Sequence, residues 1–199
     1  MNILVEQLPT TVQIDGEDVA LDTDFRSALR AILAYEDEDL TRGEKIGLLI
    51  ENLYPEPPSN LEAAARQGIW YLNGGEMPRD EAPGPRLYSI AHDARYIYAA
   101  FRQTHGIDLQ AIDYLHWWSF LALFMDLGSN TAFCGLVGFR KRLKAGKLSK
   151  DERRSYLEMK EVVDLPERDT RTPDEKARED EFMRLVEEGR KRRAAQAQG

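Results

Sequence analysis

A chain of 199 residues, 42 % of them hydrophobic and 9 % aromatic, is long enough to build one ordinary domain around a single core. A net charge of −8 and a charged fraction of 31 % predict a soluble protein with a well-hydrated exterior. The longest strongly apolar run, residues 117–125, is far shorter than the roughly 20 residues of a bilayer-spanning helix, which argues against a membrane protein.

The charge is unevenly distributed along the chain. Residues 1–86 carry a net charge of −10, whereas residues 87–163 carry +3. Contacts to phosphate backbones require cations that displace counterions, so the acidic front half disfavours nucleic acid as a partner. Cys134 is the only cysteine, and the first residues lack the basic and apolar regions of a signal peptide. We therefore expect a protein of a reducing cytoplasm.

A β-hairpin is predicted over about residues 10–22. Apolar residues alternate on both sides of an Asp-Gly pair at positions 15 and 16, at Val12, Ile14, Val19 and Leu21. Asp-Gly between two alternating runs is a strong signal for a tight hairpin turn.

Helical periodicity follows from Phe25 onward, and each expected helix begins at a recognisable cap. The expected caps are, in chain order, Thr23 or Asp24, Thr41 with Glu44, Ser59 with Glu62, Ser89, Asp108, Thr131, and Ser149 with Glu152. The helix after Asp108 is expected to run from about Leu109 to Asp126. Residues 76–86 contain three prolines and no periodicity, which indicates a loop.

These patterns predict a mainly α fold, a single helical domain of seven to eight helices with a small N-terminal β-hairpin, over residues 1–165. Residues 166–199 are expected to form a charged, partly helical, mobile tail. Its helix start at Thr172 and Pro173 is followed by few apolar residues, among them Phe182, Leu185 and Val186. Such a helix is marginal alone and would become ordered by docking on a partner.

Candidate catalytic residues lie on the expected helix 109–126. Asp113, His116 and Ser119 are spaced three apart and would share one face. A nucleophilic serine needs an oxyanion hole and an exposed turn, whereas the N–H groups around a mid-helix serine make helical bonds. We therefore interpret these residues as a structural polar seam, with a small metal-dependent hydrolase that uses Asp113 and His116 as an alternative.

No motif for a metal, a cofactor or a nucleotide is found. The histidines at 92, 105 and 116 are scattered, and neither glycine-rich phosphate motif occurs. The acidic run at 36–39 lacks the glycine and the distal glutamate of a calcium loop and is interpreted as a solvated turn. We expect no enzymatic activity and no cofactor.

Three groups of residues are candidates for partner binding. Trp117 and Trp118 project about 100° apart on a helix, so both can belong to the core or one can belong to an interface. The basic residues Arg140, Lys141 and Arg142 could bind phosphate or an acidic protein face, or simply suit a helix C-terminus. The apolar residues Phe182, Leu185 and Val186 of the tail form the third group.

Two segments of the chain resemble the phage family called bacteriophage gene product fifteen. They are "YSIAHDARYIYAAFRQTHGIDL" (88–109) and "LHWWSFLALFMDLGSNTAFCGLVGFRKR" (115–142). The matching features are the Tyr-Ser start, the Asp before "YIYAAF", "GIDL" followed by "LHWW", a Thr-x-Phe and a basic residue near Arg140. The resemblance is strict over about the central quarter of the chain and looser over residues 1–160. The acidic segment 73–86 and the glycine-containing "FCGLVGF" depart from the pattern.

The resemblance implies a phage or prophage protein, usually encoded between the major tail protein and the tape-measure protein. Proteins from that position commonly act as tail assembly chaperones. We therefore expect a non-enzymatic protein of the host bacterial cytoplasm that binds phage tail proteins, above all the tape-measure protein, as a homo-oligomer or in a complex with it. The alternative is a structural component of the tail or its connector, which would be found in the virion.

Overall fold

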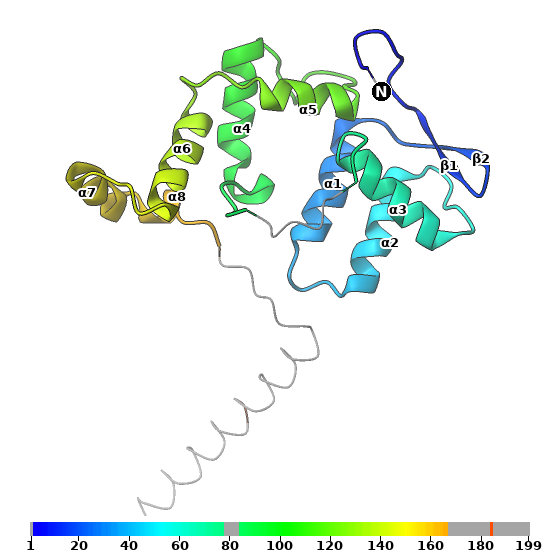
Figure 1. Ribbon diagram of the computed structural model, residues 1–199, viewed down its shortest axis with the longest axis horizontal. Coiled ribbons are helices and arrows are strands. Elements are labelled where there is room, and N and C mark those ends of the chain that lie inside the picture. The colour runs from blue at the N-terminus through cyan, green and yellow to red at the C-terminus, as the bar shows by residue number, and fades with distance from the viewer. Residues whose placement is uncertain (1, 78–83, 167–183, 185–199) are drawn as a thin grey trace, which may run out of the picture.

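The computed structural model describes residues 2–77, 84–166 and 184, and within them it contains two strands and eight helices (Figure 1). The predicted mainly α fold with a small N-terminal hairpin is confirmed. In chain order the elements are β1 (Thr11–Ile14), β2 (Glu17–Ala20), α1 (Phe25–Glu36), α2 (Arg42–Leu53), α3 (Leu61–Leu72), α4 (Ile90–His105), α5 (Trp117–Met125), α6 (Ala132–Lys144), α7 (Lys150–Glu158) and α8 (Lys160–Val163).

The hairpin forms as predicted. β1 and β2 pair antiparallel with Val12 opposite Val19. Asp15 and Gly16 both have positive φ, 52° and 88°, as a two-residue turn between twisted strands requires. Val12 and Ile14 are buried and turn one face of β1 toward α3.

Local caps fix most helix starts. The capping boxes at Thr41 and Ser149 are both present, and Asp24, Ser89 and Thr131 cap α1, α4 and α6. The cap of α3 differs from the prediction, since it is Asn60 instead of Ser59. The Asn60 side chain accepts a hydrogen bond from the N–H of Ala63 and donates to Asp15 in the hairpin turn, so it joins two elements at once.

The predicted helix 109–126 is wrong in its first half. Residues 109–111 form a turn at Asp108, and α5 begins only at Trp117. The chain is extended before α5 because it pairs with the residues that lead into α1. The N–H of Phe25 donates to Leu115 O over 2.9 Å, and the N–H of Trp117 donates to Thr23 O over 2.8 Å. This long-range pairing prevails over the helical pattern of the segment.

α5 lies between α4 and α1 (Figure 1), and its side chains Trp117, Trp118 and Phe120 belong to the hydrophobic core. The ring of Phe120 stacks on those of Phe25, Phe101 and Trp117, with centroids 4.8 to 5.4 Å apart. Trp117 and Trp118 are only 2 % and 5 % exposed, and their indole N–H groups donate to the carbonyls that end α3. Both side chains therefore belong to the core, and a role in partner binding stays a prediction.

The helix that begins at the predicted cap Ser149 is α7, which ends at Glu158, and the single turn α8 follows after Met159. The predicted tail, with its candidates Phe182, Leu185 and Val186, lies outside the described residues. Among the residues that the structure does describe, no helix is long and apolar enough to cross a membrane.

Candidate partner-binding groove

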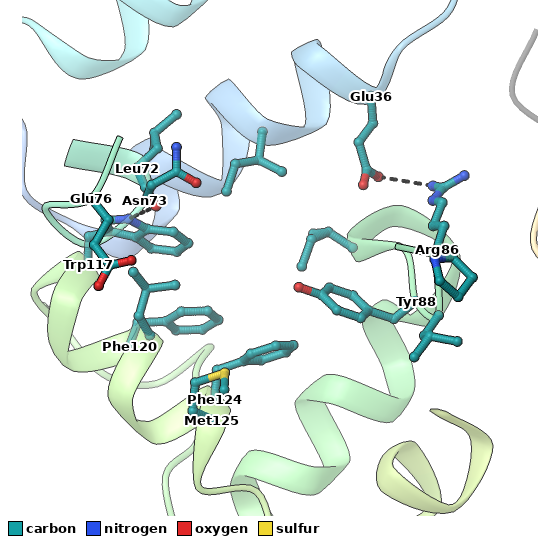
Figure 2. Close-up of a pocket in the computed structure, with 15 residues that line it drawn as sticks. Glu36, Leu72, Asn73, Glu76, Arg86, Tyr88, Trp117, Phe120, Phe124 and Met125 are labelled. Carbon is teal, nitrogen blue, oxygen red and sulfur yellow. Dashed lines mark hydrogen bonds and ion pairs between the residues drawn. The ribbon is translucent and has the colours of Figure 1, made fainter. Parts of the chain in front are cut away.

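A groove of about 860 Å³ opens between α1, the end of α3, the segment 84–89 and α5 (Figure 2). The rings of Trp117, Phe120 and Phe124 line it from α5, and the ring of Tyr88 faces them from the opposite wall. Most of the remaining lining is aliphatic. The groove therefore provides an apolar floor that can bury the side chains of a bound segment.

The floor is the front of a rigid aromatic cluster. Phe124 contacts Phe120, Tyr88 and Phe133, with ring centroids 6.1, 5.4 and 5.5 Å away. Tyr88 also meets Phe133 edge-on at 6.0 Å. Interlocked rings of this kind have few alternative rotamers, so the groove is formed before anything binds.

Charged and polar groups stand at the rim. On one side Arg86 Nη2 lies 3.4 Å from Glu36 Oε2, and on the other side are Asn73 and Glu76 (Figure 2). Desolvation, and secondarily the charge of Glu36, raises the pKa of Tyr88 above its ordinary value of 10. The phenol therefore stays neutral at physiological pH, where it is a hydrogen-bonding group of the wall.

The apolar surface continues beyond the groove. Met125 forms part of the lining and is nevertheless 83 % exposed, and Met77, five residues after the end of α3, is 52 % exposed. Exposed apolar surface beside a preformed groove is typical of sites that bind a macromolecule.

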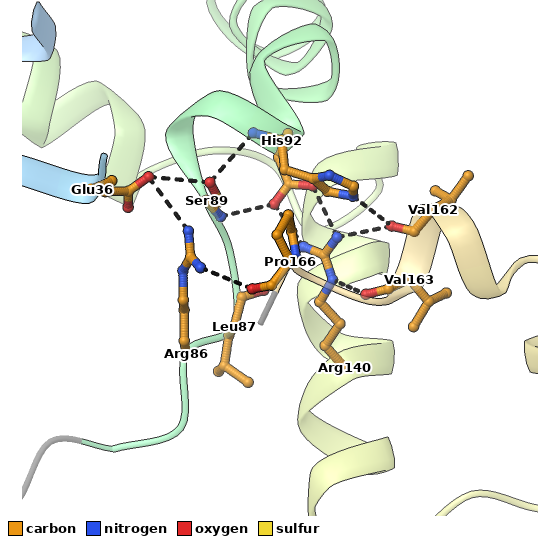
Figure 3. A network of polar contacts seen from close by, with 10 residues as sticks. Glu36, Arg86, Leu87, Ser89, His92, Arg140, Val162, Val163 and Pro166 are labelled. Atoms are coloured by element: carbon orange, nitrogen blue, oxygen red, sulfur yellow. Dashed lines mark hydrogen bonds and ion pairs between the residues drawn. The ribbon is translucent and has the colours of Figure 1, made fainter. Parts of the chain in front are cut away.

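A buried ion pair lies behind the wall that carries Tyr88. Arg140 from α6 contacts both carboxylate oxygens of Asp93 from α4, over 2.6 and 2.9 Å, and the two side chains are 2 % and 0 % exposed. The guanidinium also donates to the carbonyls of Val162, Val163 and Leu87 (Figure 3). These bonds use all five of its N–H groups, as a buried guanidinium requires.

This ion pair fixes the segment 84–89, which forms one wall of the groove. Arg140 holds the carbonyl of Leu87, and Asp93 accepts a hydrogen bond from the N–H of Ser89. The Ser89 hydroxyl in turn donates to Glu36 over 3.1 Å, which ties the segment to α1 (Figure 3). The groove and the ion pair therefore form one connected structure.

The prediction that Arg140 binds a partner is therefore wrong. All N–H groups of its guanidinium donate to groups within the chain, because this position lies on the inward face of α6. The neighbouring candidates Lys141 and Arg142 are exposed, and Arg142 pairs with Glu152 of α7 over 2.8 Å. A partner role for these two residues stays a prediction.

The predicted polar seam of Asp113, His116 and Ser119 is also wrong. Asp113 is exposed in the loop before α5, and only Ser119 lies within the helix. His116 is the N-cap: its Nδ1 accepts from the N–H of Trp118 over 3.0 Å, so its Nε2 carries the proton and donates to Pro9 O over 3.0 Å. Both ring nitrogens have structural roles, and the three side chains do not meet as a catalytic group.

The other candidate ligands are equally scattered. His105 contacts the carbonyl of Leu123 and His92 that of Val162. Within residues 2–77 and 84–166 no three His, Cys, Asp or Glu side chains are grouped as a metal site would need.

Comparison with known families identifies the body of the chain. The sequence model of the family described as "Bacteriophage Gp15 protein" matches residues 4–165. The chain belongs to this phage family. The match spans every strand and helix from β1 to α8 and ends where the described body ends. Neither the curated proteins nor the solved structures that were searched contain a match.

The groove of this phage protein was not predicted from the sequence. Its walls come from four separate stretches of chain, and no periodicity in any one of them indicates a cavity. Two signals were nevertheless present. The Tyr-Ser start of the family-like segment is Tyr88 and Ser89, and the Asp that follows is Asp93. Tyr88 lines the groove wall, and Asp93 holds that wall through the N–H of Ser89.

Proposed function

We propose that this phage protein acts without enzymatic chemistry in tail assembly, as a chaperone that holds a helical segment of the tape-measure protein in the groove. The observation that carries the proposal is the preformed aromatic floor, which continues into the exposed side chain of Met125. Membership of the phage family supports the same direction.

The chemistry of the groove suits an amphipathic helix. Such a helix inserts apolar side chains from positions i, i+3 or i+4, and i+7, and keeps its polar face in water. A tape-measure protein is a long helical chain whose apolar faces must be kept from aggregating until the tail tube surrounds it. The carboxylate of Glu76 at the rim favours a basic residue at the edge of the bound face.

Co-expression with the tape-measure protein of the same phage, followed by size-exclusion chromatography, tests the proposal. We expect one co-eluting complex with the wild type and its loss with Met125→Gln, which removes an exposed apolar contact of the groove. Leu157→Gln is the matched control, since Leu157 is 74 % exposed on α7 and does not line the groove. Separate elution of the wild-type proteins at micromolar concentration would count against the proposal.

Two further readouts separate this role from its alternatives. An assembly chaperone acts in the host cytoplasm and should be absent from purified particles, whereas a structural tail or connector protein would be detected there by mass spectrometry. Stoichiometric metal in the purified protein would contradict the non-enzymatic proposal and favour a metal-dependent hydrolase.

A further inference from the structure

The corner formed by the end of α6 and α7 carries a concentration of exposed cations. We call this surface the basic corner, and its members are Lys141, Lys144, Lys147, Lys150, Arg153 and Arg154. In the described part of the chain none of the six makes an ion pair. The ion pair between Arg142 and Glu152 binds α6 to α7 and so keeps the cations together.

The opposite kind of charge gathers at the hairpin turn. We call this surface the acidic tip, and its members are the exposed side chains of Asp15, Glu17, Asp18 and Glu62. The contacts of Asn60 with Asp15 place the first turn of α3 beside the hairpin, so the four carboxylates belong to one end of the molecule. Arg66, paired with Glu62, offsets only part of their charge.

The two surfaces lie at opposite ends of the long dimension of the body (Figure 1). α7 is at the left end and the hairpin at the right end, with the core between them. We propose that the basic corner of one copy binds the acidic tip of another, so that copies of this chain associate head to tail. The inference is independent of the groove, which lies between the two ends.

Such a contact is heterologous, because the two joined surfaces are different. A joined pair then keeps one unused basic corner on one copy and one unused acidic tip on the other, and association continues until it closes into a ring or extends as a filament. Charges attract partners over distances set by salt, about 30 Å at 0.01 M and about 8 Å at 0.15 M. The association should therefore weaken steeply with ionic strength.

A nucleic acid is the rival occupant of the basic corner. The acidic tip argues against nucleic acid as the occupant, because this chain itself supplies a negatively charged surface that the basic corner can bind. Phosphate binding would leave the acidic tip without a role, and a net charge of −8 repels a polyanion from most of the surface.

Two variants that each disable one end give a direct test. The basic-corner variant is Lys144→Gln/Lys147→Gln/Lys150→Gln. The acidic-tip variant is Asp15→Asn/Glu17→Gln/Asp18→Asn, in which Asn-Gly preserves the preferred hairpin turn. The control is Arg30→Gln/Arg95→Gln, which removes exposed cations outside both surfaces.

Sedimentation velocity in low and high salt provides the readout, and circular dichroism checks that each variant is folded. The wild type and the control should form species larger than a dimer in low salt, and at least a tenfold increase in dissociation constant is expected in high salt. Each single-end variant should remain a monomer. An equimolar mixture of the two variants should stop at a heterodimer, since only one competent contact is left.

Several results would overturn the inference. One is a wild type that stays monomeric in low salt up to about 0.5 mM. Another is a mixture of the two variants that contains only monomers. A third is a monomeric wild type that binds a 20-base oligonucleotide through the basic corner, which would assign this surface to nucleic acid.

Discussion

Arg140 and Arg142 stand two positions apart in one basic run, yet the two faces of α6 use them in opposite ways. Arg140 points inward, with a bidentate bond to Asp93 and three bonds to carbonyls. Arg142 points outward and is 46 % exposed in its pair with Glu152. A basic run is therefore not always a docking surface, because tertiary packing can bury one of its members as a structural residue.

The two pairs should differ widely in their energetic role. Removing one partner of a buried pair leaves an uncompensated charge in the interior, whereas an exposed pair is screened by water and salt. Variants of the two arginines and of Glu36 should therefore differ in the size of their effect on stability.

Arg140→Met should lower the free energy of unfolding by about 3–5 kcal/mol, because the carboxylate of Asp93 is left buried without its cation. Urea denaturation followed by circular dichroism measures the effect. Asp93→Leu/Arg140→Met should be closer to the wild type than Arg140→Met, since it leaves no buried charge. Wild-type stability of Arg140→Met would show that the ion pair with Asp93 does not hold the inward face of α6 in place.

Glu36→Gln should lower the free energy of unfolding by about 1.5–3 kcal/mol, the range for hydrogen bonds to a charged group. The side chain is 17 % exposed and accepts bonds from Ser89 and Arg86, so its loss loosens the groove wall. We expect faster hydrogen exchange in residues 84–89. Unchanged exchange in residues 84–89 would show that the contacts of Glu36 do not hold the groove wall in place.

Arg142→Met should leave the midpoint of urea unfolding unchanged within error, because its ion pair is exposed. Arg30→Met, at an exposed position of α1, is the matched control. A loss comparable to that of Arg140→Met would break the contrast between the two faces of α6.

Acidification offers the most local test. The N–H of Ser149, followed by the Arg142 side chain, lowers the pKa of Glu152 from 4.5. A lowered folded-state pKa means that the charged form stabilises the fold above the unfolded-state value, and that this stabilisation is lost as pH falls through the folded-state pKa. Titration of the side-chain carboxyl ¹³C signal of Glu152 should show a pKa below 4.5 in the wild type and a higher pKa in Arg142→Met. A titration identical in both proteins would contradict the pairing.

The sequence predicted what depends on neighbouring residues. The hairpin turn at Asp15 and Gly16 and the capping boxes at Thr41 and Ser149 are set within a few positions, so the corresponding elements were predicted correctly. The late start of α5 was not predicted, because it depends on pairing between residues 23–25 and residues 115–117, which are far apart in the sequence.

The candidate site shows the same limit. The wall around Tyr88 is formed by contacts across four stretches of chain, and the inward direction of Arg140 depends on where α4 and α8 pack. Sequence patterns allowed Trp117 and Trp118 to be core residues, but they could not indicate that Trp117, Phe120 and Phe124 would line a groove.

The most direct test of the proposed groove is a photo-crosslinker, p-benzoylphenylalanine, in place of Met125 during phage production in host cells. A second protein carries the same group in place of Leu157, which is also exposed but lies on α7. We predict a crosslink to the tape-measure protein from position 125 and none from position 157. Crosslinks from position 157 alone, or no crosslink to that protein from position 125, would contradict the account.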